Sequence, residues 1–241
     1  MERPLFLGPS LSGLLNTQFL LALLKLPIEM WLPEKAVTDT YLILQNEVRK
    51  DLGQARDAGL VQYAEGSFII PKESRLQLVL HCLESGANVE NVCKAAGWQE
   101  FEDLVKTVLE ENNYKTKKHF RFKCQGKGNE IDILAIRQPW SLVVECKRWK
   151  KSWQPSVLRK IADVQIQKTK DLASIIPGLS SALFSNLGND LRLTPVVLIL
   201  SRIPTVIHSG VPFVSICQLQ SFLEQFEGYV NDLAGIKVLD K

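Results

Sequence analysis

Two neighbouring apolar strands with charged residues set into them constrain this chain more than any other feature. Residues 131–136 (Ile-Asp-Ile-Leu-Ala-Ile) and 141–147 (Ser-Leu-Val-Val-Glu-Cys-Lys) are rich in the β-branched and apolar residues typical of strands, and Pro139 marks a turn between them. Both faces of each strand are apolar, which predicts interior strands of a sheet that is covered on both sides. The chain is therefore expected to fold around a buried sheet.

Three charged residues, Asp132, Glu145 and Lys147, lie within these strands. Glu145 and Lys147 are two positions apart, so their side chains leave the same face of the strand. A buried carboxylate is costly unless a partner or a metal neutralises it. Two carboxylates and a lysine on one face suit a hard divalent cation beside a phosphate. An ion pair of Lys147 with either carboxylate, serving only the architecture, is the alternative.

Composition is that of an ordinary globular protein, with 46% apolar and 23% charged residues over 241 positions, enough for one large or two small domains. Five cysteines without C-x-x-C spacing indicate reduced thiols in a cytoplasmic protein rather than a disulfide frame or a zinc module. The apolar stretch at residues 14–26 is too short and too polar to span a bilayer, so we expect a core helix there and no membrane association.

Charge is distributed unevenly along the chain. Residues 115–160 contain thirteen Lys and Arg against three acidic residues, a net charge of +10, whereas the rest of the chain carries −7. A charged run is usually a solvated face, but here aromatic residues lie among the charges, at Tyr114, Phe120, Phe122, Trp140, Trp149 and Trp153. Basic residues interleaved with aromatic ones favour a nucleic acid as the partner.

The N-terminal third resembles a winged helix-turn-helix in its pattern, over about residues 10–71. One helix is predicted to end near Lys25, and two more are predicted over Ala36–Ile43 and over Leu44–Ala58. A hairpin is predicted to follow around Glu65-Gly66. The exposed face of the third helix is nearly neutral in charge, so both DNA reading and protein docking remain open for this region.

Helices at Arg75–Glu84 and Val89–Ala96 are then expected to form a connector. We accordingly predict a winged-helix-like domain at 1–73, a helical connector at 74–96 and a second domain at 97–241.

The second domain is predicted to begin with a helix over Trp98–Asn112, in which Glu102 lies at the edge of the apolar stripe and can look into the core. Strands are expected at Lys115–Cys124, at the two central segments, at Leu193–Ser201 and at Val211–Ile216, with helices at 155–173 and 218–230. Gln165 falls in an apolar stripe that also contains Val164, so it either bonds buried backbone or faces the site.

These residues, taken in order, resemble the PD-(D/E)XK, or restriction-endonuclease-like, nuclease superfamily. The strings Phe101-Glu102, Gly128-x-Glu130-Ile-Asp132 and Val144-Glu145-x-Lys147-Arg-Trp149 are similar to Mrr-type restriction enzymes and archaeal Holliday-junction resolvases. Gln165 occupies a position like that of the glutamine on the following helix in RecB-like members. The resemblance covers about residues 97–201, and it departs from the motif in having Glu130-Ile131 rather than a proline before Asp132.

The resemblance implies an α/β fold with a restriction-endonuclease-like mixed sheet flanked by helices, preceded by the smaller winged-helix-like α+β domain. It implies a metal-dependent nuclease in which Asp132, Glu145 and the carbonyl of Cys146 bind Mg²⁺ or Mn²⁺. Lys147 would hold the attacking water or offset charge in the transition state, and Glu102 would bind a second metal or orient water. Residues expected to contact nucleic acid are Lys127, Arg148, Lys150, Lys151 and Gln165.

Two other readings remain open. The chain could be a DNA-binding or regulatory protein without catalysis, in which the winged helix binds and the nuclease-like domain is a scaffold. It could also be a subunit that is active only with a partner. A homodimer would suit cutting of two strands.

Overall fold

The computed structural model describes residues 15–40, 44–147, 154–179, 183–184, 190–200 and 204–238. The chain forms two compact units, Met1–Leu104 and Val105–Lys241. In the described part of the chain, no helix is both long and apolar enough to cross a membrane.

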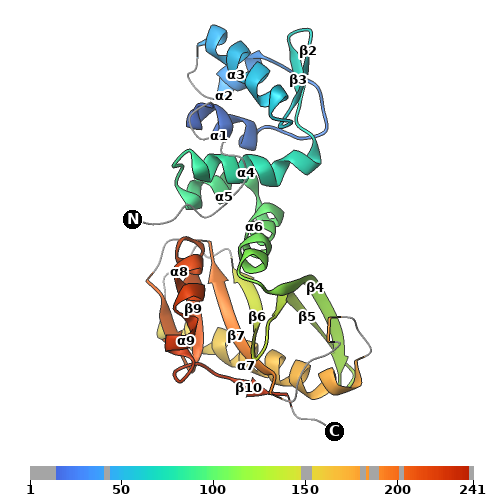
Figure 1. Cartoon of the computed structure of the whole chain (residues 1–241), viewed down its shortest axis with the longest axis vertical. Coiled ribbons are helices and arrows are strands. Elements are labelled where there is room, and N and C mark those ends of the chain that lie inside the picture. Colours follow the sequence, from blue (N-terminus) through green and yellow to red (C-terminus); the bar gives the residue numbers. More distant parts are fainter. Residues whose placement is uncertain are drawn as a thin grey trace. The chain divides into compact units, whose positions relative to one another are not determined.

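The first unit contains a small sheet and five complete helices in its described part (Figure 1). Its helices are α1 (Thr17–Lys25), α2 (Lys35–Thr40), α3 (Gln45–Asp57), α4 (Arg75–Glu84) and α5 (Val89–Ala96), and its strands are β1 (Leu32–Pro33), β2 (Gln62–Ala64) and β3 (Ser67–Ile69). The strands pair antiparallel in the order β1-β3-β2. The expected hairpin is therefore present, and β1 adds a third strand that is too short for a sequence period to reveal.

Local signals set the first helix. The side chain of Asn16 caps α1 by accepting from the backbone N–H of Gln18 at 2.7 Å. Phe19, Leu20 and Leu23 of this helix are buried, which confirms the expected core helix. The guanidinium of Arg75 in α4 donates to the carbonyl of Ala96 at 2.8 Å, so it joins the start of α4 to the end of α5.

Helix α6 (Trp98–Glu111) contains the boundary between the two units. All five apolar residues of its predicted stripe are buried: Phe101, Leu104, Val105, Val108 and Leu109.

The second unit is a seven-stranded mixed sheet flanked by helices, which confirms the predicted fold class (Figure 1). The strands are β4 (Lys115–Cys124), β5 (Lys127–Ile136), β6 (Trp140–Lys147), β7 (Arg192–Ile199), β8 (Val206–His208), β9 (Val211–Ser215) and β10 (Ile236–Lys237). The order is β4-β5-β6-β7-β9-β8, with β10 paired to the start of β7. β4, β5 and β6 form an antiparallel meander, and β7 and β9 continue the sheet in parallel with β6.

Helix α7 (Pro155–Ile175) packs along one face of this sheet, where its apolar residues contact two core clusters. Leu172 packs with Leu134 and Val143, and Leu158 packs with Val197 and Phe213. The helix expected at 218–230 is instead two short helices, α8 (Leu219–Glu224) and α9 (Phe226–Tyr229). In Figure 1, α7 lies behind the sheet and α8 and α9 lie in front of it.

The buried stripe of α7 differs from the predicted one. Val164 was expected in the core but is 63% exposed. The side chains that face the sheet include Ala162, Gln165 and Thr169, which recur at helical spacing and are each 1% exposed or less. The two polar residues are tolerated because each is hydrogen-bonded, Gln165 to the carbonyl of Val143 and Thr169 to the carbonyl of Gln165. The buried face predicted from apolar residues alone is therefore rotated about the helix axis relative to the observed one.

Candidate active site

The candidate site lies where β5 and β6 stop pairing with each other. Their backbone ladder ends at Ile133 and Val144, and its register places Asp132 opposite Glu145, one step further along. Residues opposite each other in an antiparallel pair project from the same face. The backbone N–H of Cys146 donates to Asp132 Oδ2 at 2.7 Å, so a carboxylate and not a strand carbonyl satisfies this amide. Asp132 thus holds the two diverging strand ends together.

Glu145 is held by two ammonium groups. Lys147 Nζ donates to its Oε1 at 2.5 Å, and Lys168 Nζ of α7 donates to its Oε2 at 2.6 Å. Burial by itself raises the pKa of Glu145, but the hydrogen bonds and charges of Lys147 and Lys168 outweigh it and hold that pKa below its ordinary value. Glu145 is therefore an ionised carboxylate at neutral pH.

The site is partly open to solvent. The side chain of Lys147 is 37% exposed, whereas those of Glu145 and Lys168 are 12% and 17% exposed. The predicted convergence of Glu145 and Lys147 on one face of β6 is confirmed by their ion pair. Among the described residues at these strand ends, two carboxylates and two lysines supply equal and opposite charges, and the lysine at the open side is reachable by a polyanion.

Lys168 was not singled out from the sequence. Its signal was nevertheless present, because Lys168 lies three residues after Gln165 and so on the same side of α7. A polar residue one turn beyond another polar residue in a buried stripe is a candidate for the same site.

Gln165 is one of the residues predicted to contact nucleic acid, with backbone bonding as the alternative. The structure places it 1% exposed, with Nε2 donating to the carbonyl of Val143 at 2.8 Å. In this position the amide joins α7 to β6 and does not face solvent. The structure therefore corresponds to the alternative, a structural bond to buried backbone.

Glu102 of α6 is buried, with 3% of its surface exposed, as expected for a carboxylate at the edge of a core-facing stripe. It lies within the first unit and has an interaction partner. Its proposed place in cation binding stays a prediction.

Glu130, which lies two residues before Asp132, is paired with the neighbouring strand. It accepts from Arg121 Nε at 2.6 Å and lies 3.4 Å from His119 Nδ1. The hydrogen bond from Arg121 lowers the pKa of Glu130. Its role in this structure is that of a surface ion pair between β4 and β5.

Of the predicted nucleic-acid contacts, Lys127 is exposed at the start of β5. Arg148, Lys150 and Lys151, together with Trp149 and Trp153, lie outside the described residues. The structure adds a basic face on β4 that charge counting did not resolve. Alternate residues of this strand are cationic and exposed: Lys115, Lys117, Arg121 and Lys123. The opposite face carries Phe120 and Phe122, which pack on the core.

Among the residues that the structure describes, no group of three or more His, Cys, Asp or Glu side chains lies together as a ready metal site. The oxygen donors at the strand ends are two carboxylates, Asp132 and Glu145, and the carbonyl of Cys146. Hard oxygen donors of this kind suit Mg²⁺, which keeps several waters and binds through one or two carboxylates beside a phosphate. The donor set fits such a cation, provided that an ammonium group releases an oxygen of Glu145.

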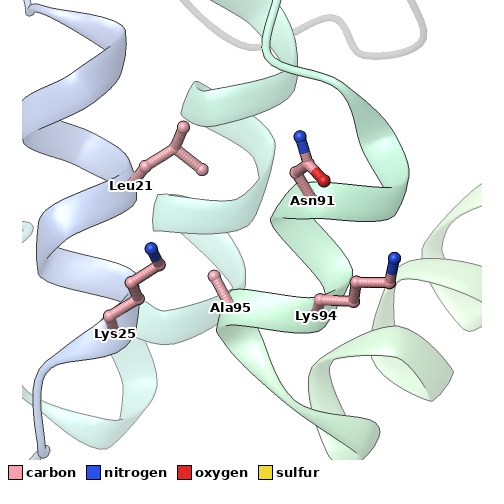
Figure 2. A pocket seen from close by; sticks show the side chains of 5 residues that line it. All are labelled: Leu21, Lys25, Asn91, Lys94 and Ala95. Carbon is pink, nitrogen blue, oxygen red and sulfur yellow. The ribbon is translucent and has the colours of Figure 1, made fainter.

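A separate groove lies in the first unit, between α1 and α5 (Figure 2). It has a volume of about 490 Å³ and is lined by Leu21, Lys25, Asn91, Lys94 and Ala95. Lys94 donates to Glu90 at 2.5 Å, and Lys25 also has an interaction partner. One of the two lysines that line this groove is therefore held in an ion pair.

The second unit has a mixed sheet with an antiparallel meander, a crossover helix, and acidic and lysine side chains at two strand ends, which is consistent with a restriction-endonuclease-like fold. Comparison with protein families agrees. Residues 93–176 match the family model Mrr_cat, described as "Restriction endonuclease", which confirms the resemblance drawn from the sequence.

Two further comparisons give relatives of the chain. An uncharacterized protein of Archaeoglobus fulgidus is 28% identical over 136 residues, which cover 56% of this chain and 95% of that protein. The crystal structure of protein VC1899 from Vibrio cholerae aligns with 78% of this chain at a TM-score of 0.34 and 12% identity, and the chain spans 44% of its length.

Proposed function

We propose that this protein hydrolyses phosphodiester bonds in nucleic acid, most simply DNA, with the help of Mg²⁺ or Mn²⁺. The observation that carries the proposal is the gathering of Asp132, Glu145 and Lys147 at the diverging ends of β5 and β6, with Lys147 open to solvent. The match of residues 93–176 to a restriction endonuclease family supports the same chemistry.

Asp132, Glu145 and the carbonyl of Cys146 would hold the cation, and Glu102 is proposed as a further ligand or as a group that orients water. When bound, the cation would polarise the scissile phosphate and acidify the attacking water. In the reaction, the water oxygen forms a bond to phosphorus, one ester P–O bond breaks, and the leaving oxygen takes up a proton. The products are a phosphate monoester and a free hydroxyl.

Lys147 is the residue best placed to act on the reacting phosphate. It is more exposed than Glu145 and Lys168, and its ammonium would offset the negative charge on the phosphoryl oxygens of the transition state. Fixed positive charge directed at a transition state is among the largest catalytic effects. The pair with Glu145 orients this ammonium.

The basic face of β4 would bind the phosphate backbone away from the reacting bond. Strand geometry separates Lys115 from Lys117, and Arg121 from Lys123, by about 6.7 Å along the strand, and His119 lies between the two pairs. Lys127 adds a further cation at the β4–β5 turn. Binding through such contacts is independent of sequence and weakens steeply with salt.

Cleavage assays on a panel of substrates test the proposal. Duplex DNA, a four-way junction, single strands and RNA are incubated with Mg²⁺, Mn²⁺ or EDTA, with the wild type and with Asp132→Asn, Glu145→Gln and Lys147→Met. We expect cation-dependent cleavage by the wild type, loss of about 10²-fold or more in each variant, and a milder loss in Glu102→Gln.

Glu130→Gln is the matched control, because it removes a carboxylate from the same strand but outside the cluster. Circular dichroism and melting curves show that each variant is folded. Cleavage that survives in all three cluster variants would refute the assignment.

A second function, DNA binding without catalysis, is favoured by one observation. Both oxygens of Glu145 are already neutralised by lysines, so the cluster is balanced without a cation. Salt-sensitive DNA binding with no cleavage across all substrates and cations would support this function instead.

A further inference from the structure

Lys168 is a second lysine of the cluster, supplied by a different element. Its ammonium donates to Glu145 Oε2 at 2.6 Å, while the other oxygen of Glu145 accepts from Lys147. The side chain of Lys168 is largely buried, at 17% exposed, so this is not a loose surface pair. Nothing in the motif that suggested the nuclease includes this lysine.

The fold fixes the position of Lys168. Gln165, one turn earlier on α7, donates to the carbonyl of Val143, and Lys168 reaches Glu145, two residues further along β6. Residues two apart on a strand and three apart on a helix each share a face. The helix is therefore attached to the strand at two matching points, and Lys168 is directed at Glu145 by the same packing that buries Gln165.

The charges around Glu145 determine how a cation can bind there. Asp132 and Glu145 supply two negative charges, and Lys147 and Lys168 supply two positive charges. A divalent cation that binds Glu145 adds two positive charges beside these ammonium groups, and the repulsion favours displacement of one ammonium group from a carboxylate oxygen. Lys168 occupies Oε2, and a displaced ammonium in a partly buried site needs a new anionic partner. A phosphodiester brought to the site is such a partner.

We propose that Lys168 is an exchangeable counter-ion of Glu145, an inference that rests on the proposed nuclease function. Without a cation, Lys168 neutralises Oε2. When a divalent cation takes that oxygen, the ammonium of Lys168 turns to the phosphodiester of the substrate. Lys168 therefore weakens binding of the cation alone and strengthens the coupling between cation and nucleic acid, which is reciprocal by thermodynamic linkage.

Binding measurements on the full chain test this exchange without relying on catalysis. Titration calorimetry with Ca²⁺ in the absence of DNA gives the affinity for the cation, and fluorescence anisotropy of a short DNA duplex, with and without Ca²⁺, gives the coupling. In Lys168→Met we expect Ca²⁺ to bind about fivefold or more tightly than in the wild type, and the Ca²⁺-induced gain in DNA affinity to shrink by about fivefold or more. General damage to the fold would not be expected to strengthen Ca²⁺ binding while it weakens the coupling between Ca²⁺ and DNA.

Lys170→Met is the matched control, because Lys170 is an exposed lysine on the same helix. Lys168→Arg is a second variant in which the ion pair is strengthened, since a guanidinium binds a carboxylate with two donors, and it should weaken Ca²⁺ binding. This variant decides the matter if Lys168→Met does not fold.

The outcomes separate this inference from the nuclease proposal. If the wild type binds Ca²⁺ and cleaves DNA with Mn²⁺, but Lys168→Met matches Lys170→Met in both measurements, the exchange is refuted and the nuclease proposal is retained. Weaker Ca²⁺ binding in Lys168→Met likewise overturns the exchange. If the wild type neither binds Ca²⁺ nor cleaves, both proposals fail together.

Discussion

Gln165 shows how one buried amide can set the geometry of a charged cluster. Its Nε2 donates to the carbonyl of Val143, and it is one turn from the lysine that neutralises Glu145. A buried polar group of this kind is retained because removing it leaves its partner without a hydrogen bond. The contribution of Gln165 is therefore to position α7 rather than to touch the substrate.

This position leads to a prediction for Gln165→Leu. The substitution keeps the side-chain size and leaves the carbonyl of Val143 without this donor, so the free energy of unfolding should fall by about 1–3 kcal/mol. Urea denaturation measures the loss, and Gln167→Leu at an exposed position of the same helix is the control. Unchanged stability combined with a reduced salt dependence of DNA binding would instead identify Gln165 as a nucleic-acid contact.

At the scale of elements, an ion pair holds together the strands and helices of the first unit. Glu34, just before α2, accepts from Arg49 of α3 at 2.8 Å and from the hydroxyl of Tyr63 in β2 at 2.5 Å. Glu34 is buried, at 6% exposed. The hydrogen bonds from Tyr63 and Arg49 lower the pKa of Glu34, so folding favours its ionised form.

A pH dependence follows from the direction of this shift. Because the folded-state pKa lies below the unfolded one, the stabilisation is present above about pH 4.5 and is lost as pH falls through the folded-state value. We therefore expect Glu34→Gln to lower the melting temperature near pH 7, and the difference from the wild type to shrink near pH 3. A difference that is equal at both pH values would show that Glu34 stabilises the unit by packing and not by charge.

The elements also show which parts of the fold could be predicted from the sequence. Periodicity located the long helices and central strands, because apolar residues at a regular spacing are imposed by burial. It located α7 but assigned part of its buried face wrongly, because Thr169 is buried there and Val164 is exposed. It also could not show β1, β8 and β10, because two or three residues are too few to display a period.

Within the site, the spacing along one strand was sufficient to predict that Glu145 and Lys147 share a face. Helical geometry was sufficient to predict that Glu102 can face the core. Lys168 required the tertiary structure. Its partner lies 23 positions earlier in the sequence, on another element, and only the packing of α7 on β6 brings the two together.

At the scale of the whole molecule, charge separates the two units. Residues 1–104 contain nine Lys and Arg against fourteen Asp and Glu, a net charge of −5, whereas residues 105–241 contain twenty against twelve, a net charge of +8. A polyanion is attracted by the second unit and repelled by the first. The first unit is thus an unfavourable place for phosphate-backbone binding, even though α3 has exposed cations.

Paired variants in the full chain test this division. Lys117→Gln with Lys123→Gln removes two exposed cations from β4, and Lys50→Gln with Arg56→Gln removes two from α3. If the second unit binds the backbone, the first pair should reduce the slope of log affinity against log salt by about 1.8, because each phosphate contact contributes about 0.9. The second pair should leave the slope unchanged. Anisotropy with a DNA duplex in EDTA, at several salt concentrations, gives both slopes without cleavage. A loss confined to the α3 pair would place the DNA-binding surface in the first unit and would favour the function without catalysis.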